Sequence, residues 1–427
     1  MLPLSFTQVL LVSLFFFYAL SPLTPSLSYN FHNGQRLAQI FLLTLLSISL
    51  IRENQLKIPQ RGIVYPVAIL LLISLISSLT SNFPLSSFLN TLHYVLLLTS
   101  TIFIINTQKD VEFLFIFIFF IHTCLIVVCT LNIIFAIFDN SPIHIHNIIM
   151  KFDNIRHFNH FQVLILPLGF YILSKTKLKI LVSSAIILNL LILAMSNSLA
   201  ALVCYSTILF LYFIFKLYDS LKSVLLLTTI SLFLYLILII TGPEAVNKSV
   251  FLSDSGRVEM WMNSIPYFKD LLLGIGVGNY QVRLDSVILS HPHNSFIQVL
   301  VEQGFISLII CFYLLFMTIF IFFKNKKNSK KIIAFITFIT AIVYSLFSGL
   351  IVMPTTQIIF VLIFSQLIEC EKTTSLNNKM KIFVATTTLV YFTLAIISFY
   401  QLEPNSPKMA GPSFWSAGEK NLEGLYR

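Results

Sequence analysis

The chain has 427 residues, of which 57% are hydrophobic and only 10% are charged, and its mean hydropathy is +0.90. A soluble domain needs a solvated surface and cannot carry this composition together with 42 phenylalanines. The net charge of +10 does not by itself indicate a nucleic-acid partner, because Lys and Arg are also expected in the loops of membrane proteins. The composition therefore indicates a polytopic membrane protein.

A bilayer core about 30 Å thick is crossed by roughly 20 apolar helical residues, and such segments recur along the whole chain. We count about thirteen, or twelve if a short segment is discounted, which predicts an all-α fold with about 12–13 transmembrane helices. They run approximately Leu4 to Leu20, Leu37 to Ile51, Ile63 to Ser81, Leu89 to Ile105, Phe113 to Phe138, Phe158 to Leu173, Ile180 to Met195, Leu199 to Phe215, Val224 to Ile240, Phe296 to Phe323, Ile332 to Ile351, Ile358 to Ile368 and Ile382 to Phe399.

The positions of Lys and Arg predict the orientation, because cytoplasmic loops carry an excess of both. The even-numbered joints between segments hold 17 of the 27 basic residues, including the run Lys324 to Lys331, where attraction to anionic lipid headgroups adds a second reason for the charge. We therefore expect a cytoplasmic N-terminus and an outer tail from Gln401. The first segment lacks a basic leader and a clear cleavage site, so we interpret it as a retained span.

Two outer loops, Asp139 to His157 and Thr241 to Ser295, interrupt the otherwise short joints, and six of the nine histidines lie in or beside them. They divide the chain into an N-terminal transmembrane bundle of about nine helices (1–240, with a periplasmic loop at 139–157), a large periplasmic loop (241–295), a C-terminal transmembrane bundle (296–399) and a short tail (400–427). Any chemistry is expected on this outer side.

Metal and disulfide chemistry have little support in the sequence. All five cysteines lie in or at the edge of apolar segments, which argues against a disulfide framework. The pairs His144-x-His146 and His291-x-His293 have an alternate spacing, but a catalytic zinc site needs a third protein ligand in a recognisable position. We therefore predict no metal.

Two further features leave alternatives open. The run Gly274-Ile275-Gly276-Val277-Gly278 lets the backbone approach either a phosphate or a neighbouring helix. Glu302 is the one acidic residue placed well inside a predicted span, so it is either a site residue that faces a cavity or a structural acceptor for a donor such as Gln303.

An ordered set of motifs in and after the long loop resembles the bacterial O-antigen ligase and O-antigen polymerase superfamily. The set consists of Arg257 and Trp261, then Pro266, the Gly274–Tyr280 turn, His293-Asn294-Ser295-Phe296, and Glu302-Gln303-Gly304 at the start of the next span. The combination is much more specific than any single piece.

The resemblance extends over nearly the whole chain. Arg156-His157-Phe158-x-His160 resembles the entry to the sixth span of family members. The stretch Tyr344 to Pro354 and the tail motif Phe414-Trp415-x-x-Gly418 resemble the branch that includes protein O-oligosaccharyltransferases. One departure is that Met195 to Ala200 lacks the Ser-Arg pair of many ligases, and Arg156 is the candidate replacement for that cationic contact.

The resemblance implies a membrane glycosyltransferase of GT-C-like architecture in the bacterial inner membrane, with a periplasmic active site. The implied reaction moves a glycan from a polyprenyl (undecaprenyl) pyrophosphate carrier to a hydroxyl of the lipid A core or of a protein Ser or Thr, without a cofactor or nucleic acid and among membrane lipids. A related alternative is polymerisation of the same lipid-linked glycan. A transporter or flippase ranks lower, because few carboxylates and broken helices are available near the membrane midplane, and a non-catalytic scaffold is a further alternative.

This implied chemistry assigns roles to individual residues. Arginine stabilises the developing charge of a pyrophosphate leaving group, and a histidine is suited to accept the proton of an attacking hydroxyl. We assign the catalytic roles to Arg257 and His293. The candidate substrate-binding residues are Arg156, His157, His160, Arg283, His291, Asn294, Glu302, Gly276 and Gly278.

Overall fold

The computed structural model describes residues 4–28, 30–106, 111–141, 143, 145–241, 257–265, 272–284, 287–325, 328–401, 409–410 and 413–415. The predicted residues His144, Pro266 and Gly418 lie outside these ranges. The elements are α1 (Leu4–Leu20), α2 (Phe31–Ile51), β1 (Gln55–Pro59), α3 (Arg61–Leu79), α4 (Pro84–Asn106), α5 (Val111–Phe138), α6 (Ile145–Ile148), α7 (Ile155–Lys175), α8 (Lys179–Met195), α9 (Leu199–Ile214), α10 (Tyr218–Thr241), α11 (Arg257–Met262), β2 (Val282–Leu284), β3 (Val287–Leu289), α12 (Ser295–Lys324), α13 (Ser329–Ser345), η3 (Leu350–Val352), α14 (Pro354–Leu367), β4 (Cys370–Ser375), α15 (Asn378–Tyr400) and β5 (Met409–Ala410).

Each of the thirteen predicted apolar segments falls on a helix, so the all-α class of a polytopic membrane protein is confirmed. By length and composition, seven of the described helices are suited to cross a membrane: α2, α3, α4, α5, α10, α12 and α15. The largest boundary differences are equal and occur at the start of α10, at the end of α13 and at the start of α2, which begins at Phe31 rather than at Leu37. Its first turn is polar, so hydropathy alone does not detect it, but the Asn30 side chain accepts a hydrogen bond from the amide of Asn33 and caps the helix.

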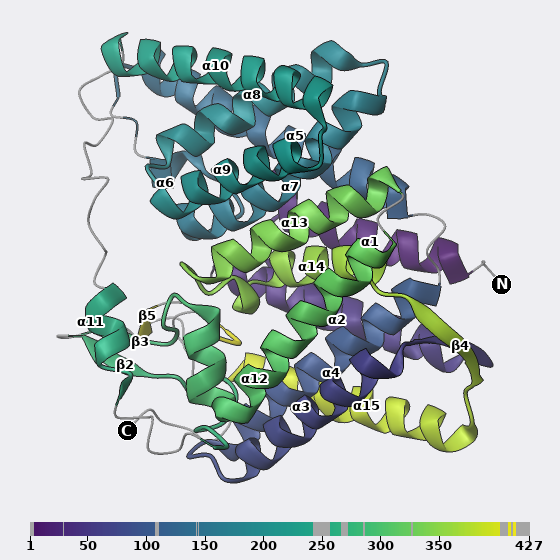
Figure 1. The fold of residues 1–427 in the computed structure, drawn as a ribbon. Helices are drawn as coiled ribbons and strands as arrows, with labels where there is room; N and C mark the ends of the chain where they lie inside the picture. Colours follow the sequence, from purple (N-terminus) through teal and green to yellow (C-terminus); the bar gives the residue numbers. More distant parts are fainter. Residues whose placement is uncertain are drawn as a thin grey trace.

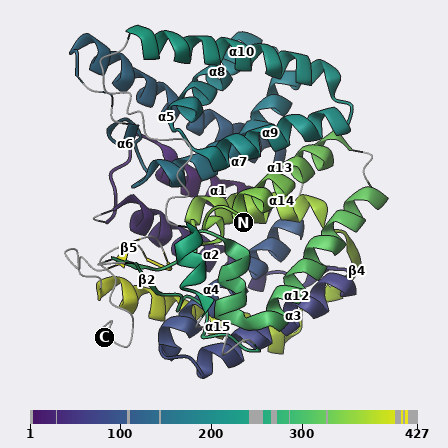
Figure 2. The ribbon, with the colours of Figure 1, turned by 60° about the vertical axis from the view of Figure 1, so that its left-hand side comes forward.

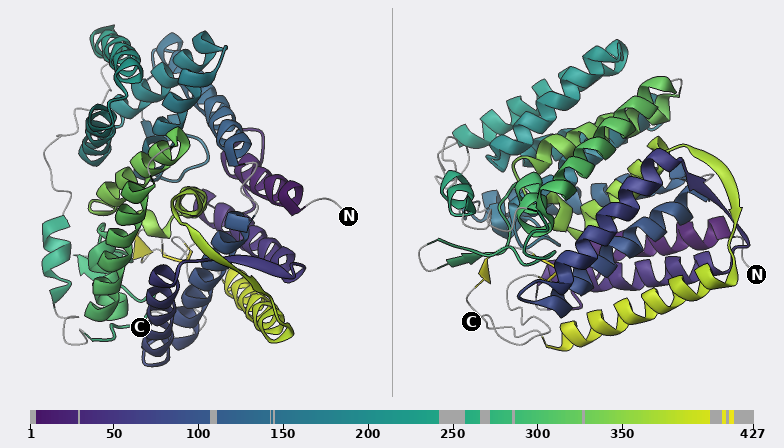
Figure 3. Two further views of the ribbon diagram at one scale, coloured as in Figure 1. Left: turned by 45° about the vertical axis from the view of Figure 1, so that its right-hand side comes forward. Right: turned by 60° about the horizontal axis from the view of Figure 1, so that its bottom comes forward.

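One end of the helices, here called the basic face, gathers the even-numbered joints. Strands β1 and β4 pair antiparallel there and connect the joint after α2 to the joint after α14. At the same face Lys330 forms an ion pair with Glu112, which also accepts a hydrogen bond from the Tyr171 hydroxyl at 3.1 Å. Figure 3 shows β4 at one end of the helices and the β2–β3 hairpin at the other.

The opposite end, here called the histidine face, gathers the odd-numbered joints. Asp153, in the joint after α5, accepts hydrogen bonds from the amides of Phe31 and His32 at the start of α2, at 2.8 and 2.9 Å. His160 near the start of α7 contacts Ser348 in the joint after α13. Successive long helices therefore run from one face to the other, as consecutive membrane crossings require.

Helices from the two halves of the sequence intermix. Helix α13 packs against α7 and α9, α14 packs against α4, and α15 packs against α2. Figures 1 and 2 show α13 and α14 in the middle of the molecule, with α5 and α7–α10 on one side and α2–α4, α12 and α15 on the other. The helices after residue 295 thus complete the packing of the earlier ones.

Helix α12 is interrupted at Gly304, whose φ of 82° and ψ of 176° are not helical. The turn that contains Gly274, with φ of 72°, packs directly on this interruption. The amides of Ile275 and Gly276 donate to the carbonyls of Val301 and Glu302 at 3.0 and 2.9 Å. These bonds satisfy the carbonyl groups that the break releases, which is the condition for an irregular backbone inside a membrane protein.

We predict that Gly304→Ala destabilises the protein by about 2 kcal/mol or more, because a side chain at this φ is strained. A Cβ atom would also lie 2.2 Å from the Leu272 carbonyl oxygen, in a backbone that has no room to shift. The matched control is Gly62→Ala, where the Cβ atom would meet only the flexible Met317 side chain at 3.1 Å. Thermal unfolding in detergent should separate the two variants, and equal unfolding temperatures would contradict the packing described here.

Candidate functional site

Five histidines from three separate segments form a cluster at the histidine face. His32 belongs to the first turn of α2, His157 and His160 to the first turns of α7, and His291 and His293 to the loop before α12. The rings of His291 and His293 are 4.2 Å apart between centroids, and those of His157 and His160 are 6.0 Å apart. His291 interacts electrostatically with the other four, so this set is called the histidine cluster.

The loop that carries His291 and His293 is held from both sides. The indole Nε1 of Trp261, in α11, donates to the Pro292 carbonyl at 2.7 Å. On the other side the His291 ring packs so closely on Gly349 that a Cβ atom there would lie 2.4 Å from the ring. His293 has a φ of 51°, which non-glycine residues rarely adopt. The loop conformation is therefore imposed by its neighbours, and figure 1 shows α11 beside the start of α12.

His293 interacts electrostatically with two arginines, Arg156 and Arg257. Burial, and after it the charges of Arg156, Arg257 and His157, together lower the pKa of His293 to about 3. The ring is thus neutral at pH 7, and within the described residues its Nδ1 has no hydrogen-bond partner. A neutral imidazole with an available nitrogen is the form that accepts a proton or a hydrogen bond.

The first turns of α7 present Arg156, His157 and His160 on the same side of the molecule. Asn154 caps this helix through a 2.8 Å bond from the Arg156 amide. His160 is buried, its Nε2 lies 2.6 Å from the Ser348 hydroxyl, and its ring meets Tyr344 edge-on. His160 is therefore part of the wall of the cluster, whereas Arg156 is half-buried beside His293.

The joint after α8 lacks the arginine of the Ser-Arg pair that many ligases carry. This joint lies next to α7. The Asn159 side chain donates to the Ser196 hydroxyl at 3.0 Å. Asn159 is three residues from Arg156 and so lies about one turn along α7. Arg156 therefore lies within about a turn of α7 from this joint, and its role as the replacement for the missing arginine stays a prediction.

Gly276 and Gly278 make close contacts with helices, which answers the question that the sequence left open. A Cβ atom at Gly276 would lie 2.4 Å from the Ser81 Cβ atom, and one at Gly278 would lie 2.5 Å from the Asn90 side chain. These positions are the ends of α3 and α4. The close backbone approach is therefore to neighbouring helices, and the expectation of a phosphate contact at these glycines has no support in their described contacts.

Glu302 and Asn294 likewise have structural partners. The buried Glu302 carboxylate accepts a hydrogen bond from the Gln298 amide at 3.1 Å and from the backbone amides of Gly278 and Tyr280. Asn294 caps α12, because its Oδ1 accepts from the amides of Phe296 and Ile297 at 2.9 and 3.1 Å. Glu302 is thus a structural acceptor, although not for Gln303 as the sequence suggested. Arg283 lies in β2 opposite Ile288, and its side chain is outside the described residues.

Sequence reasoning missed the polar first turns of α2. His32, Arg36 and Gln39 recur with helical spacing and are all buried. The Nε of Arg36 donates to the Phe414 carbonyl at 2.9 Å, and its Nη1 donates to Gln357 at 2.7 Å. A stripe of polar residues that begins an apolar helix was the available signal, because such residues face the interior of a membrane protein and not lipid.

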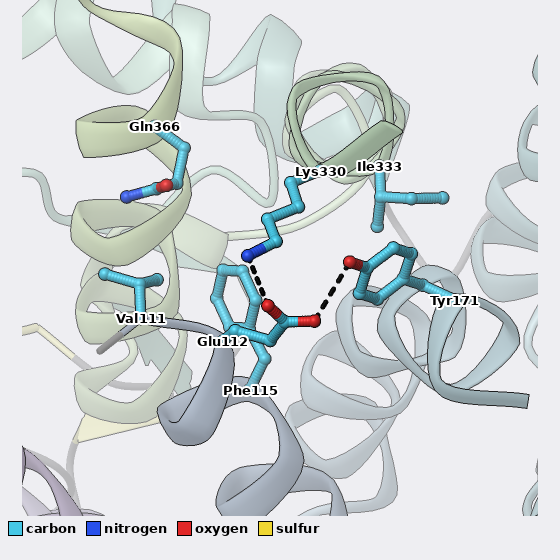
Figure 4. A pocket seen from close by; sticks show the side chains of 7 residues that line it. All are labelled: Val111, Glu112, Phe115, Tyr171, Lys330, Ile333 and Gln366. Atoms are coloured by element: carbon cyan, nitrogen blue, oxygen red, sulfur yellow. Dashed lines mark hydrogen bonds and ion pairs between the residues drawn. The ribbon is translucent and has the colours of Figure 1, made fainter. Parts of the chain in front are cut away.

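The described residues include no group of three or more His, Cys, Asp or Glu side chains placed to hold a metal ion. Their one characterised pocket lies at the basic face, where Glu112, Tyr171, Lys330 and Gln366 surround a space of about 30 Å³ (Figure 4). This space accommodates water but is far too small for a glycan. The histidine cluster is therefore the stronger candidate site.

Comparison with known families bears on the same region. Residues 184–313 match the family model described as O-antigen ligase. This region of the chain is therefore similar to O-antigen ligases. No curated protein matches the chain. The matched residues include Arg257, His291 and His293, whereas His32 and the α7 residues lie before them. The apolar helices show that the chain is a multi-pass membrane protein.

We predict that Asn294→Ala lowers stability by about 1 kcal/mol, because two helix amides lose their acceptor. Asn294→Ser should retain most of the stability, because a serine hydroxyl also caps helices. Thermal unfolding in detergent should be measured for both variants. A cap predicts a clearly smaller loss in the serine variant, whereas an unchanged unfolding temperature in Asn294→Ala would contradict the capping role.

We also predict an acid-dependent contribution of His293 to stability. Its folded pKa of about 3 lies below the ordinary value of about 6.5, so the neutral ring is stabilising above about pH 6.5. This contribution is lost as the pH falls towards 3, because the unfolded state binds the proton first. The free energy of unfolding of the wild type should therefore fall relative to His293→Gln by up to about 1.4 kcal/mol per pH unit below pH 6.5. A constant difference from pH 7.5 to 4.5 would refute the lowered pKa.

Proposed function

We propose that this protein transfers a glycan from a polyprenyl-pyrophosphate carrier to an acceptor hydroxyl at the histidine face. The observation that carries the proposal is the electrostatic interaction of Arg156 and Arg257 with the buried His293, in a chain whose residues 184–313 match the O-antigen ligase family model. Two cations beside a neutral base suit a reaction that releases a pyrophosphate.

The arginines act on the leaving group. Guanidinium groups bind phosphate oxygens in a bidentate manner and are always charged. In a site largely closed to water, such groups stabilise the negative charge that develops on the pyrophosphate as its bond to the sugar breaks. Arg257 approaches from α11 and Arg156 from α7, so the two can engage different phosphates of one carrier.

His293 acts on the attacking hydroxyl. The hydroxyl oxygen forms a bond to the anomeric carbon, the carbon–oxygen bond to the pyrophosphate breaks, and the electron pair of that bond leaves with the pyrophosphate. The hydroxyl proton passes to His293. A pKa of about 3 in the free protein is low for a base, but bound pyrophosphate offsets the two arginines and so raises this pKa towards the working pH.

The basic face identifies the cytoplasmic side in this proposal. Its joints carry most of the lysines and arginines, and cytoplasmic loops are enriched in both. The histidine face is then periplasmic and the N-terminus cytoplasmic, in the inner membrane of a bacterium. The acceptor in the proposal is the lipid A core or a protein Ser or Thr, and the glycan is carried by undecaprenyl pyrophosphate.

The test is deletion and complementation with surface glycan analysed on gels. We expect Arg257→Ala, Arg156→Ala and His293→Ala each to lower transfer at least tenfold, since each removes a group that contacts the transition state. Arg257→Lys should restore activity only in part, because lysine cannot form the bidentate contact. Arg61→Ala is the matched control, because Arg61 is exposed at the basic face.

The glycan pattern of the deletion strain separates the related reactions. Loss of the ladder on the lipid A core indicates a ligase, and a single repeat unit indicates a polymerase. Loss of glycan from a particular protein indicates a protein oligosaccharyltransferase. Unchanged surface glycan in Arg257→Ala and His293→Ala would refute all three.

A further inference from the structure

His32 has an environment that neither the catalytic assignment nor the family match accounts for. It is 2% exposed and sits in the first turn of α2, within electrostatic reach of His157 and His291. The carboxylate of Asp153, three residues before Arg156, binds its backbone amide at 2.9 Å. The first turn of α2 is thereby fixed to the start of α7.

The C-terminal tail sets the tautomer of this ring. His32 Nε2 lies 3.3 Å from the carbonyl oxygen of Phe414. A carbonyl only accepts hydrogen bonds, so Nε2 carries the proton and the lone pair of the neutral ring is on Nδ1. We assign the neutral ring because Arg36, one turn further along α2, already places a cation at this buried position.

The Phe414 carbonyl is itself held in place. It also accepts a hydrogen bond from Arg36 Nε at 2.9 Å. The next residue, Trp415, is fully buried and its indole donates to the Ser398 hydroxyl at 2.8 Å. The tail therefore acts as a rigid acceptor that fixes both the orientation and the tautomer of His32.

His32 Nδ1 has no hydrogen-bond partner among the described residues, although the atom is buried. A buried acceptor without a donor is costly, and a ligand or a water can complete the bond. The lone pair repels phosphate oxygens, so its partner must be a hydroxyl or another hydrogen-bond donor.

We propose that His32, held by the Phe414 carbonyl, accepts a hydrogen bond from a hydroxyl of the substrate within the histidine cluster. This inference rests on the proposed glycan transfer. It makes the first turn of α2 and the C-terminal tail part of hydroxyl recognition, while the arginines bind the pyrophosphate. The hydroxyl belongs either to the donor glycan or to the acceptor.

The test uses two substitutions, each of which retains one of the two hydrogen-bonding positions of the imidazole. His32→Gln retains a donor near the Nε2 position for Phe414 but loses the Nδ1 acceptor. His32→Asn retains an amide oxygen near the Nδ1 position but loses the bond to Phe414. Purified full-length protein is assayed with lipid-linked glycan extracted from the deletion strain and with acceptor from the same strain.

We expect His32→Gln to lower kcat/KM about tenfold to a hundredfold, as for a lost hydrogen bond to a buried acceptor, and His32→Asn to retain more activity. A raised KM for the lipid-linked glycan places the hydroxyl on the donor, and a raised KM for the acceptor places it there. Binding of undecaprenyl pyrophosphate without sugar should be unchanged in His32→Gln but weakened in Arg257→Ala.

A matched control is His122→Gln, the same change at a buried histidine of α5 that packs on Phe158 and Phe161. It should leave both KM values unchanged. Wild-type kcat/KM in His32→Gln would overturn the inference. So would weakened binding of the sugar-free carrier, or equal loss of activity and unfolding temperature in His32→Gln and His32→Asn.

These outcomes are distinct from failure of the proposed function. If the protein does not transfer glycan, Arg257→Ala and His293→Ala also leave the surface glycan unchanged. If only the role of His32 is wrong, those two variants lose transfer while His32→Gln behaves as the wild type.

Discussion

The buried guanidinium of Arg36 connects segments that are far apart in the sequence. It donates to the Phe414 carbonyl, to Gln39 and Gln357, and to the Val352 carbonyl, and it contacts His93. An ion inside a membrane protein is tolerated only where such groups replace its water. The tail, the joint after α13 and the helices α2, α4 and α14 must therefore assemble around it together, and this assembly forms one wall of the histidine cluster.

The same need for hydrogen-bond partners inside the protein explains why the histidine cluster lies among loops and beside the broken helix α12. Loops at membrane depth must find hydrogen-bond partners within the protein. The loop before α12 obtains them from Trp261 and from the cap of Asn294, and the turn at Gly274 obtains them from the break in α12. These contacts leave the Nδ1 atoms of the histidine cluster buried and without described partners, and such atoms are what a polar substrate can engage.

The charges of the polar groups give the arginines and His293 different roles. Burial keeps His293 neutral, and the charges of Arg156 and Arg257 raise the cost of a further positive charge there. A pyrophosphate reverses that effect because it brings negative charge to the same place. Donor binding then raises the pKa of His293. In our proposal, His293 therefore becomes an effective base only when the donor is bound.

Much of the fold and part of the site could be predicted from the sequence. Hydropathy located all thirteen long helices, because lipid exposure demands apolar residues, and the ordered motifs indicated Arg257 and His293. Polar positions were harder to interpret. Asn294, Gly276, Gly278 and Glu302 were expected to contact substrate, yet their described partners are helix amides and neighbouring helices. From the sequence alone, a polar residue that contacts substrate cannot be distinguished from one that caps a helix.

The sequence by itself determined the helical class, the alternation of basic and polar joints, and the motif that carries His293. These follow from local composition and from the thickness of a bilayer. Only the tertiary structure decided that α2 contributes His32 and that residue 414 of the tail binds it. Contacts between residues 382 positions apart depend on how the helices pack, and no local pattern of residues specifies that packing.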